Sequence, residues 1–139
     1  MSIAKNLLAT LALGTIAMSA PAFADKMKAT LNAASEVPPN ASPATGTADI
    51  DFDPATKKLS WKMTYTGLTG PATMAHFHGP AEPGKNAGIA VPIAPASSPS
   101  EGSATLTDAQ AADLVAGKYY VNVHTEANKG GEIRGQVTK

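Results

Sequence analysis

The chain has 139 residues, and its 11 lysines and arginines balance its 11 aspartates and glutamates, so its formal net charge is zero. It contains no cysteine, which excludes disulfide bonds, thiolate metal sites and cysteine nucleophiles. A neutral chain without a basic patch lacks the positive charge that supplies most non-specific affinity for nucleic acid, so we expect no nucleic-acid partner.

The N-terminus has the three parts of a secretory signal peptide. Lys5 supplies a short positive region, residues 7–18 form an apolar run, and Ala22-Phe23-Ala24 offers the small residues that a signal peptidase reads. The apolar run is too short to cross ~30 Å of hydrocarbon as a helix. We therefore expect residues 1–24 to be removed, leaving one periplasmic or secreted β-domain over residues 25–139 with no membrane span. An uncleaved anchor and a core helix are the alternatives.

Apolar and polar residues of the mature part alternate with period two between closely spaced turns, which predicts an all-β fold, an antiparallel Greek-key-like sandwich or barrel with one short helix. Residues 26–34 are the first predicted strand, which stops at Glu36-Val37-Pro38-Pro39. Residues 47–53 and 58–66 alternate most clearly, and Asp53-Pro54-Ala55-Thr56 between them is a turn sequence, so these strands predict a hairpin. Their apolar residues, Trp61 included, are expected in one core.

The second half predicts shorter elements. Residues 73–78 and 89–93 are two predicted strands, and Pro92 places the second at an edge or a bulge because proline cannot donate to a ladder. Residues 94–100, rich in proline and small side chains, are expected to be a surface loop. One helix is predicted at 108–116, with a capping box at Thr107 and Gln110 and a terminating glycine at Gly117. The last two predicted strands are residues 119–125 and 132–137.

All three histidines of the chain fall on predicted strands. Residues two apart in a strand point to the same side, so His76 and His78 project together. In the strand 119–125, Tyr119, Val121 and Val123 form the apolar face, whereas Tyr120, Asn122 and His124 form the other. If the apolar faces meet in one core and the two strands are neighbours, the three imidazoles converge on the outer surface of the sandwich.

Converging imidazoles bind borderline metals such as Cu²⁺ or Zn²⁺, because a neutral ring donates its lone pair without adding a charge. The pattern predicts a metal site at His76, His78 and His124. Copper is favoured, with zinc as the alternative, because the compartment is extracytoplasmic and the thioether of Met74 shares the face. Two other interpretations stay open: hydrogen-bonded surface histidines, and a catalytic role without metal. No catalytic residue and no organic cofactor is predicted.

The surroundings of the histidines give three further expectations. Residues 79–88 and 126–131 should lie at the same end of the sandwich as His78 and His124 and form a rim over the site. Glu82 could supply an oxygen ligand, although a charged loop residue is more often simply solvated. Glu132 could accept the second N–H of a metal-bound histidine, but a cross-strand ion pair worth under ~1 kcal/mol is the favoured interpretation.

Several motifs follow one another in order along the mature chain. They are Glu36-Val37-Pro38-Pro39, Ala44-Thr45-Gly46, Gly67-Leu68, Ala75-His76-Phe77-His78-Gly79, Tyr120-Val121-Asn122-Val123-His124-Thr125 and residues 128–136. Together they resemble the CHRD domain, a module first described as repeats in chordin and found widely in bacterial secreted proteins. Lys129 departs from the proline common in that family. Because the family is defined by sequence more than by biochemistry, the resemblance implies no particular activity.

A weaker similarity is to copper–zinc superoxide dismutase, in which a Gly-Leu turn also precedes a strand carrying His-x-His. Its cysteines and its additional zinc-binding histidines are missing here, which argues against a full copper–zinc enzyme. Three functions remain: an exported protein that binds a metal, preferably copper; a non-catalytic extracytoplasmic protein-interaction module; and a copper-only oxidoreductase acting on superoxide or peroxide. We favour the first, with the metal ion as the main partner, a protein partner as a further possibility, and no enzymatic turnover.

Overall fold

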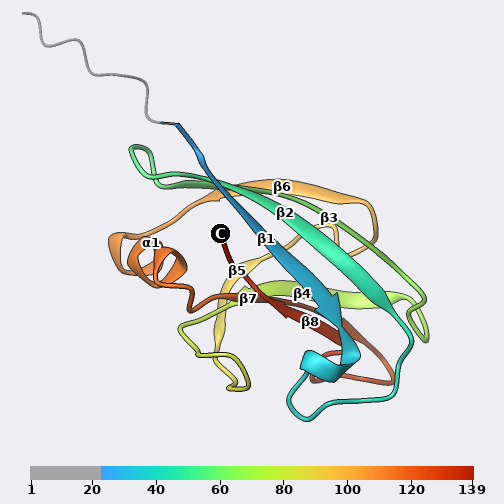
Figure 1. Ribbon diagram of the computed structural model, residues 1–139. Helices are drawn as coiled ribbons and strands as arrows, with labels where there is room; N and C mark the ends of the chain where they lie inside the picture. Colours follow the sequence, from blue (N-terminus) through green and yellow to red (C-terminus); the bar gives the residue numbers. More distant parts are fainter. Residues whose placement is uncertain (1–22) are drawn as a thin grey trace, which may run out of the picture.

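The computed structural model describes residues 23–139, which form one eight-stranded antiparallel sheet curved into a nearly closed barrel (Figure 1). In chain order the elements are β1 (Asp25–Asn32), the 3-10 helix η1 (Ala33–Ser35), β2 (Thr45–Asp53), β3 (Lys58–Thr66), β4 (Ala72–His78), β5 (Ile89–Pro92), β6 (Ser100–Thr105), α1 (Asp108–Val115), β7 (Tyr120–Thr125) and β8 (Ile133–Gln136). Across the sheet the order is β5-β4-β7-β8-β1-β2-β3-β6. The predicted all-β antiparallel class is therefore confirmed, and the crossing connections β3–β4 and β6–β7 give it Greek-key character.

The predicted signal peptide falls largely on residues 1–22, which lie outside the described residues. Its cleavage after Ala24 therefore stays a prediction. In the described part of the chain, no helix has both the length and the apolar character needed to cross a membrane.

The expected central hairpin is confirmed, since β2 and β3 pair in register from Asp53↔Lys58 to Thr45↔Thr66. The turn between them is held by the Asp53 side chain, whose Oδ1 accepts a hydrogen bond from the Ala55 N–H at 2.9 Å. The alternating pattern directs one face of both strands inward and buries Ile50, Phe52, Leu59, Trp61 and Met63, as predicted. Tyr65, which was also expected in the core, is partly buried and packs against it.

The inward faces of the two halves of the barrel meet at Trp61 of β3 and Phe77 of β4. Their rings pack edge to face with centroids 5.4 Å apart, and only 7% of Trp61 is exposed. Edge-to-face aromatic pairs add to the free energy of burial, so this contact ties β4, which carries two histidines, to the central hairpin.

Strand β6 was not among the predicted elements, and the loop expected over residues 94–100 ends where this strand begins. Its sequence, Ser-Glu-Gly-Ser-Ala-Thr, contains Thr105 as its one β-branched residue and no aromatic residue, so its composition gives little indication of a strand. Long-range pairing decides the outcome instead, because β6 adds to β3 in register from Lys58↔Thr105 to Met63↔Ser100. Gly102 is required there, since any Cβ would overlap the indole ring of Trp61.

The remaining expectations are confirmed with small shifts of the ends. The first strand ends at Asn32 rather than at residue 34, because the Asn32 side chain accepts a hydrogen bond from Ser35 N–H and caps η1. The capping box of α1 forms at Thr107 and Gln110 as predicted. β5 is an edge strand with an irregular register at its pairing with Phe77 and His78, in keeping with Pro92.

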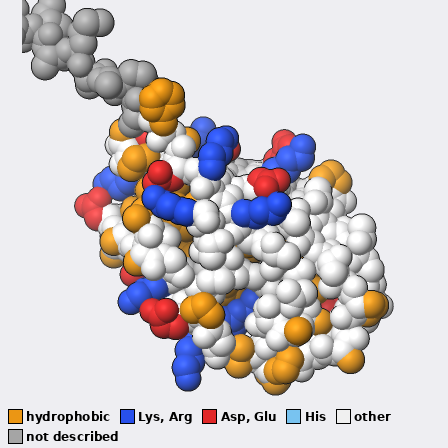
Figure 2. Space-filling view, viewed as in Figure 1, with side chains coloured by type: hydrophobic (Ala, Val, Ile, Leu, Met, Phe, Trp, Pro, Cys, Tyr) orange, Lys and Arg blue, Asp and Glu red, His pale blue; other side chains and the backbone are white. Residues whose placement is uncertain are grey.

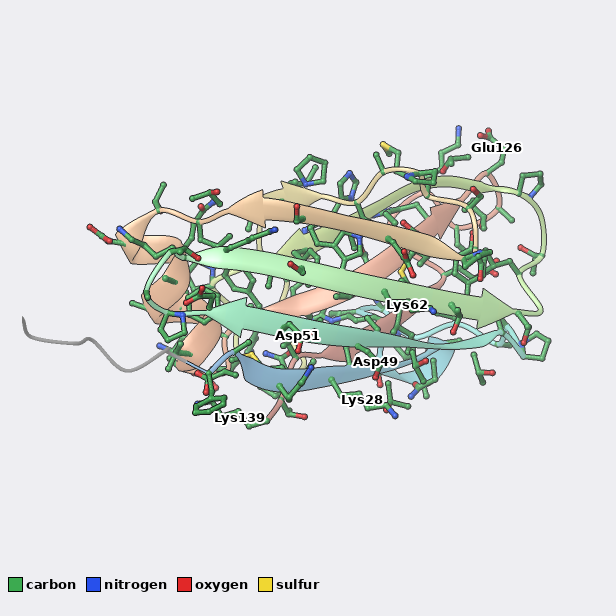
Figure 3. The ribbon with its side chains drawn as sticks, turned by 90° about the horizontal axis from the view of Figure 1, so that it is seen from above. Lys28, Asp49, Asp51, Lys62, Glu126 and Lys139 are labelled. Atoms are coloured by element: carbon green, nitrogen blue, oxygen red, sulfur yellow. The ribbon has the colours of Figure 1, made fainter. Side chains whose placement is uncertain are left out.

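Lysines and acidic residues lie beside one another across the outer surface of the sheet, where Asp49 of β2 pairs in register with Lys28 of β1 on one side and with Lys62 of β3 on the other (Figure 3). We call it the lysine–aspartate face and define it by Lys26, Lys28, Asp49, Asp51, Lys62 and Glu101. Lys26 and Asp51 approach to 2.6 Å and Lys62 and Glu101 to 3.5 Å. Blue and red side chains also lie next to one another in the space-filling view (Figure 2).

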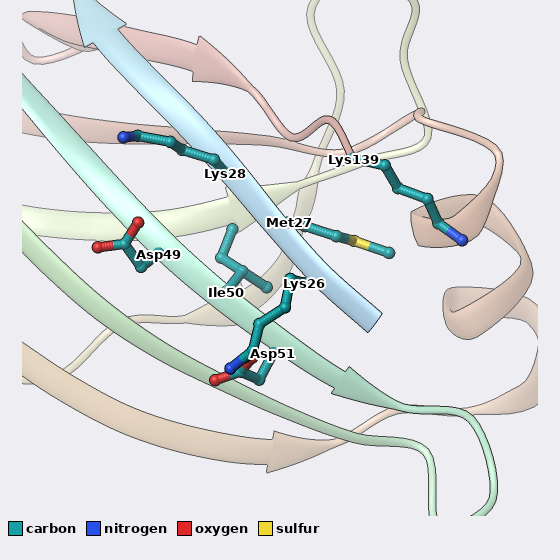
Figure 4. A pocket seen from close by; sticks show the side chains of 7 residues that line it. All are labelled: Lys26, Met27, Lys28, Asp49, Ile50, Asp51 and Lys139. Carbon is teal, nitrogen blue, oxygen red and sulfur yellow. The ribbon is translucent and has the colours of Figure 1, made fainter. Parts of the chain in front are cut away.

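An open hollow of ≈ 400 Å³ crosses β1 and β2 on this side (Figure 4). Its lining is Lys26, Met27, Lys28, Asp49, Ile50, Asp51 and Lys139. Lys26 and Asp51 form their ion pair at this hollow, and its lining residues include no histidine or hydroxyl side chain.

Candidate metal centre

Strands β4 and β7 are antiparallel neighbours, as the metal hypothesis requires. In register, His76 faces Asn122, and the diagonal positions are occupied by His124, which faces Met74, and by His78, which faces Tyr120. The three histidines therefore share one outer face, on which His78 and His124 lie on either side of the His76–Asn122 pair. We call it the histidine face and define it by Met74, His76, His78, Tyr120, Asn122, His124, Arg134 and Gln136.

The three imidazoles converge. One ring nitrogen of each histidine lies within 4.8 Å of the other two. His76 Nδ1 and His124 Nε2 are 3.2 Å apart. Two nitrogens that bind one ion at ~2.0–2.1 Å and at an angle near that of a tetrahedron are separated by ~3.3 Å. The pair already has the spacing of two ligands of a common ion.

Backbone carbonyls orient two of the rings. His124 Nδ1 lies 2.8 Å from the carbonyl oxygen of Lys129, and His78 Nδ1 lies 3.0 Å from that of Ala87. Because a carbonyl only accepts, a ring that donates its Nδ1 proton there has its lone pair on Nε2. Metal-binding histidines in proteins are held in this way by a hydrogen bond from the second nitrogen.

The histidines occupy the outer face but are not surface residues. Their exposed fractions are 7% for His76, 8% for His78 and 6% for His124, because loops fold over them. Burial, with the charges of His124 and His78 adding to it, lowers the pKa of His76 from 6.5 to about 4. Burial also lowers the pKa of His78, although the carbonyl of Ala87 and the side chain of Asn122 oppose the effect. Both rings are therefore neutral at neutral pH, the state in which imidazole binds a metal.

The two covering loops do not lie at one end of the barrel, and that expectation was wrong. Because β4 and β7 run antiparallel, residues 79–88 leave at the His78 end of the pair and residues 126–131 leave at the Thr125 end. Both loops then fold back over the same face, where their carbonyls reach His78 and His124. The shelter expected of a rim is thus provided from two opposite sides.

Aromatic and cationic groups hold the first of these loops in place. The Tyr120 ring stacks on His78 with centroids 4.8 Å apart and planes 6° from parallel, and its hydroxyl accepts the Ala87 N–H at 3.1 Å. The guanidinium of Arg134 lies 3.4 Å from the centre of the same ring and donates to Asn86 Oδ1 at 2.9 Å and to the Lys85 carbonyl. The position of the Ala87 carbonyl, and through it that of His78, is therefore determined by β7 and β8.

Two buried polar residues beside the histidines were not assigned a role from the sequence. Asn122 is 2% exposed, and its Oδ1 lies 2.9 Å from His78 Nε2. Glu36 is 4% exposed; burial raises the pKa of its carboxyl, opposed by the charge of Arg134 and by hydrogen bonds from the Val37 N–H and the Asn122 amide. The signals were present in the sequence, since Asn122 shares a strand face with His124 and Glu36 opens one of the motifs.

Comparison with protein families gives one result that bears on this site. A family model described as the CHRD domain matches residues 27–137, which is most of the chain and includes all three histidines. The chain belongs to the CHRD family. Comparison with curated proteins and with solved structures gave no match.

Glu82 and Met74 were the two further side chains weighed as ligands, and this CHRD domain places them differently. Glu82 is exposed, and its Oε1 lies 3.8 Å from Lys118 Nζ, outside the histidine group. Met74 faces His124 in the register but is 49% exposed.

Glu132 plays a different part from either of the two expected. Among the described residues it is neither in an ion pair nor bound to a histidine ring. Its fully buried carboxylate accepts hydrogen bonds from the Thr69 N–H at 3.0 Å, the Thr69 hydroxyl, the Thr125 hydroxyl at 3.1 Å and the Asn128 amide at 2.8 Å. Glu132 therefore anchors the loop whose Lys129 carbonyl orients His124.

Proposed function

We propose that this CHRD domain is an exported protein that binds one copper ion through His76 Nδ1, His78 Nε2 and His124 Nε2. The observation that carries the proposal is the convergence of three buried imidazoles, two of which are oriented by backbone carbonyls that accept from Nδ1 and leave Nε2 for the ion. Imidazole suits both copper and zinc, and divalent copper binds such sites more tightly than zinc does. Copper is therefore the ion we propose.

The low exposure of the ligands supports storage or transport of the ion rather than turnover. Only 6–8% of each histidine is exposed, and the loops of residues 79–88 and 126–131 cover the face. An oxidoreductase needs an open position at which its substrate reaches the metal. We therefore propose a carrier or buffer, and an assay of superoxide and peroxide consumption by the copper-loaded protein separates it from an oxidoreductase.

The test starts from untagged protein exported to the periplasm of a bacterial host, because a histidine tag would itself bind copper. Metal analysis of the purified protein and titration with Cu²⁺ and Zn²⁺ should give one copper per chain and tighter binding of copper. Each of His76→Gln, His78→Gln and His124→Gln should weaken copper binding by more than the ~10–100-fold loss typical of changing an outer partner of a metal site.

Glu82→Gln is the matched control, since it removes a charge from the covering loop at a residue that lies away from the histidines. It should leave copper affinity unchanged. A parent protein that takes up no copper, or a triple histidine variant that binds copper like the parent, would overturn the proposal and leave the interaction module as the better account.

Copper binding should also stabilise the folded protein, and it should depend on pH. At a free concentration a hundredfold above its dissociation constant, the ion should raise the free energy of unfolding by about 2.7 kcal/mol. Protons compete with copper for the same lone pairs. The affinity for copper should therefore decrease as the pH is lowered, beginning near the ordinary histidine pKa of ~6.5. Because the pKa of His76 is lowered to about 4, part of the binding should persist in the interval between those values.

A further inference from the structure

The ring of His78 lies between two hydrogen-bond acceptors. Its Nδ1 is 3.0 Å from the carbonyl oxygen of Ala87, and its Nε2 is 2.9 Å from Oδ1 of Asn122. A neutral imidazole carries one N–H, so in either tautomer one of its nitrogens meets an acceptor with a lone pair. The ring is also buried, at 8% exposure, and packs against the rings of His76 and His124.

The Asn122 amide is held so that its oxygen faces His78. Its Nδ2 lies 3.5 Å from the carbonyl oxygen of Gly130 and on the same side as the carboxylate of Glu36, whose pKa it lowers. Turning the amide over would point Oδ1 at these two acceptors and lose the bond to Gly130. Gly131 packs against the same groups, since a Cβ there would overlap Glu36 Oε1 and lie 2.7 Å from Asn122 Nδ2. The contact between Oδ1 and Nε2 is therefore a built feature of the face.

We propose that Asn122 Oδ1 is a fourth protein ligand of the copper ion, an inference that rests on the proposed function. A cation placed between Nε2 and Oδ1 converts two facing acceptors into two ligands. Two donor atoms that each lie ~2.0–2.2 Å from one ion, with a donor–ion–donor angle of about 90°, are ~2.9 Å apart. The distance between His78 Nε2 and Asn122 Oδ1 is 2.9 Å. Asn122 also faces His76 across the β4–β7 register, in the middle of the three histidines.

The fourth ligand determines which form of copper the site prefers. An amide oxygen is a hard donor, and carbonyl oxygens suit hard cations better than soft ones. Cu²⁺ gains more from such a donor than Cu⁺, for which three imidazoles suffice. Asn122 should therefore act on the ratio of the two affinities, whereas the histidines act on both.

The experiment measures the dissociation constants of Cu²⁺ and of Cu⁺, each by competition with a chelator of known affinity, for the parent and for Asn122→Leu and Asn122→Asp. Leucine has a similar volume and no donor atom, so Asn122→Leu should weaken Cu²⁺ binding by about 10–100-fold and leave Cu⁺ binding within about threefold. Asn122→Asp keeps the oxygen and adds a charge, so it should strengthen Cu²⁺ binding relative to Cu⁺ binding. Asn40→Leu is the control, because the Asn40 amide donates to the backbone carbonyl of Glu132 rather than to a histidine ring; it should leave the ratio unchanged.

The outcomes separate this inference from the function on which it rests. A parent that binds neither form of copper overturns both. A parent that binds copper through its histidines, with Asn122→Leu losing nothing or losing Cu²⁺ and Cu⁺ equally, overturns the fourth ligand alone. If Asn122→Leu does not fold, Asn122→Asp decides: its negative oxygen must raise the preference for Cu²⁺ over Cu⁺, and an unchanged ratio overturns the inference.

Discussion

The two outer faces of the barrel follow the same alternation of polar and apolar residues but differ in what covers them. On the lysine–aspartate face, the side chains of Lys26 and Asp51 are 83% and 46% exposed. On the histidine face, His76 and Asn122 are 7% and 2% exposed. The difference comes from the connections, because the β2–β3 turn is tight, whereas residues 79–88 and 126–131 fold back over their strands.

This difference changes what a polar side chain does. On an open face water satisfies it, and an ion pair between two long side chains adds little. Under a loop each polar group needs a partner within the protein, because an unsatisfied buried group costs about 1–3 kcal/mol. The carbonyls of Ala87 and Lys129 meet this need for two histidines. The lone pairs left over on the remaining ring nitrogens are what a metal ion can use.

The largest effect on the free energy of unfolding should come from Trp61, which joins the two halves of the barrel. Trp61→Ala removes a 7% exposed ring packed on Phe77, and it should lower the free energy of unfolding by ~3–5 kcal/mol. Chemical denaturation measures this loss, and Trp61→Phe, which keeps an aromatic ring, should lose less. A midpoint that barely moves after Trp61→Ala would show that the two halves do not depend on this contact.

A smaller effect is expected where a buried carboxylate anchors a covering loop. Burial raises the pKa of Glu132, but hydrogen bonds from Thr69, Asn128 and Thr125 outweigh it and hold the pKa below its ordinary value of 4.5. The stability that the carboxylate contributes is therefore present above pH 4.5 and is lost as the pH falls through the lowered pKa.

Glu132→Gln should accordingly lower the free energy of unfolding by about 1–3 kcal/mol at neutral pH and make it less sensitive to acid below pH 4.5. Denaturation curves recorded from pH 7 to pH 3 test both effects. Glu101→Gln is the control, because Glu101 is an exposed partner of Lys62 at 3.5 Å. Equal losses in the two variants would contradict the contrast between the covered and the open face.

The smallest effect is expected on the open face itself. Lys26→Met breaks the 2.6 Å ion pair with Asp51, but both side chains are solvated, so the free energy of unfolding should change by less than ~1 kcal/mol. The small change should shrink further in high salt, which screens exposed charges. A loss of unfolding free energy comparable to that of Glu132→Gln would mean that polar side chains on the open face contribute to stability as much as those on the covered face.

Local pattern was enough for much of this structure. Alternation identified the hairpin of residues 47–53 and 58–66 and the buried position of Trp61, because the direction of a side chain in a strand repeats every two residues. The capping box at Thr107 and Gln110 located the helix from four neighbouring residues. The same rule of two put His76 and His78 on one side of their strand, and the apolar face of residues 119–125 put His124 on the outer side of its own strand.

What the sequence by itself determined, then, is which side of its strand each histidine occupies; the tertiary structure decided what surrounds them. Strand β6 forms by pairing with β3 despite a composition that disfavours strands. The burial of the histidines, the hydrogen bonds of Glu132 and the contact of Asn122 with His78 all depend on loops or strands distant in the chain. The physical reason is that periodicity reports the direction of a side chain relative to its own backbone, whereas burial depends on where the remote loops run.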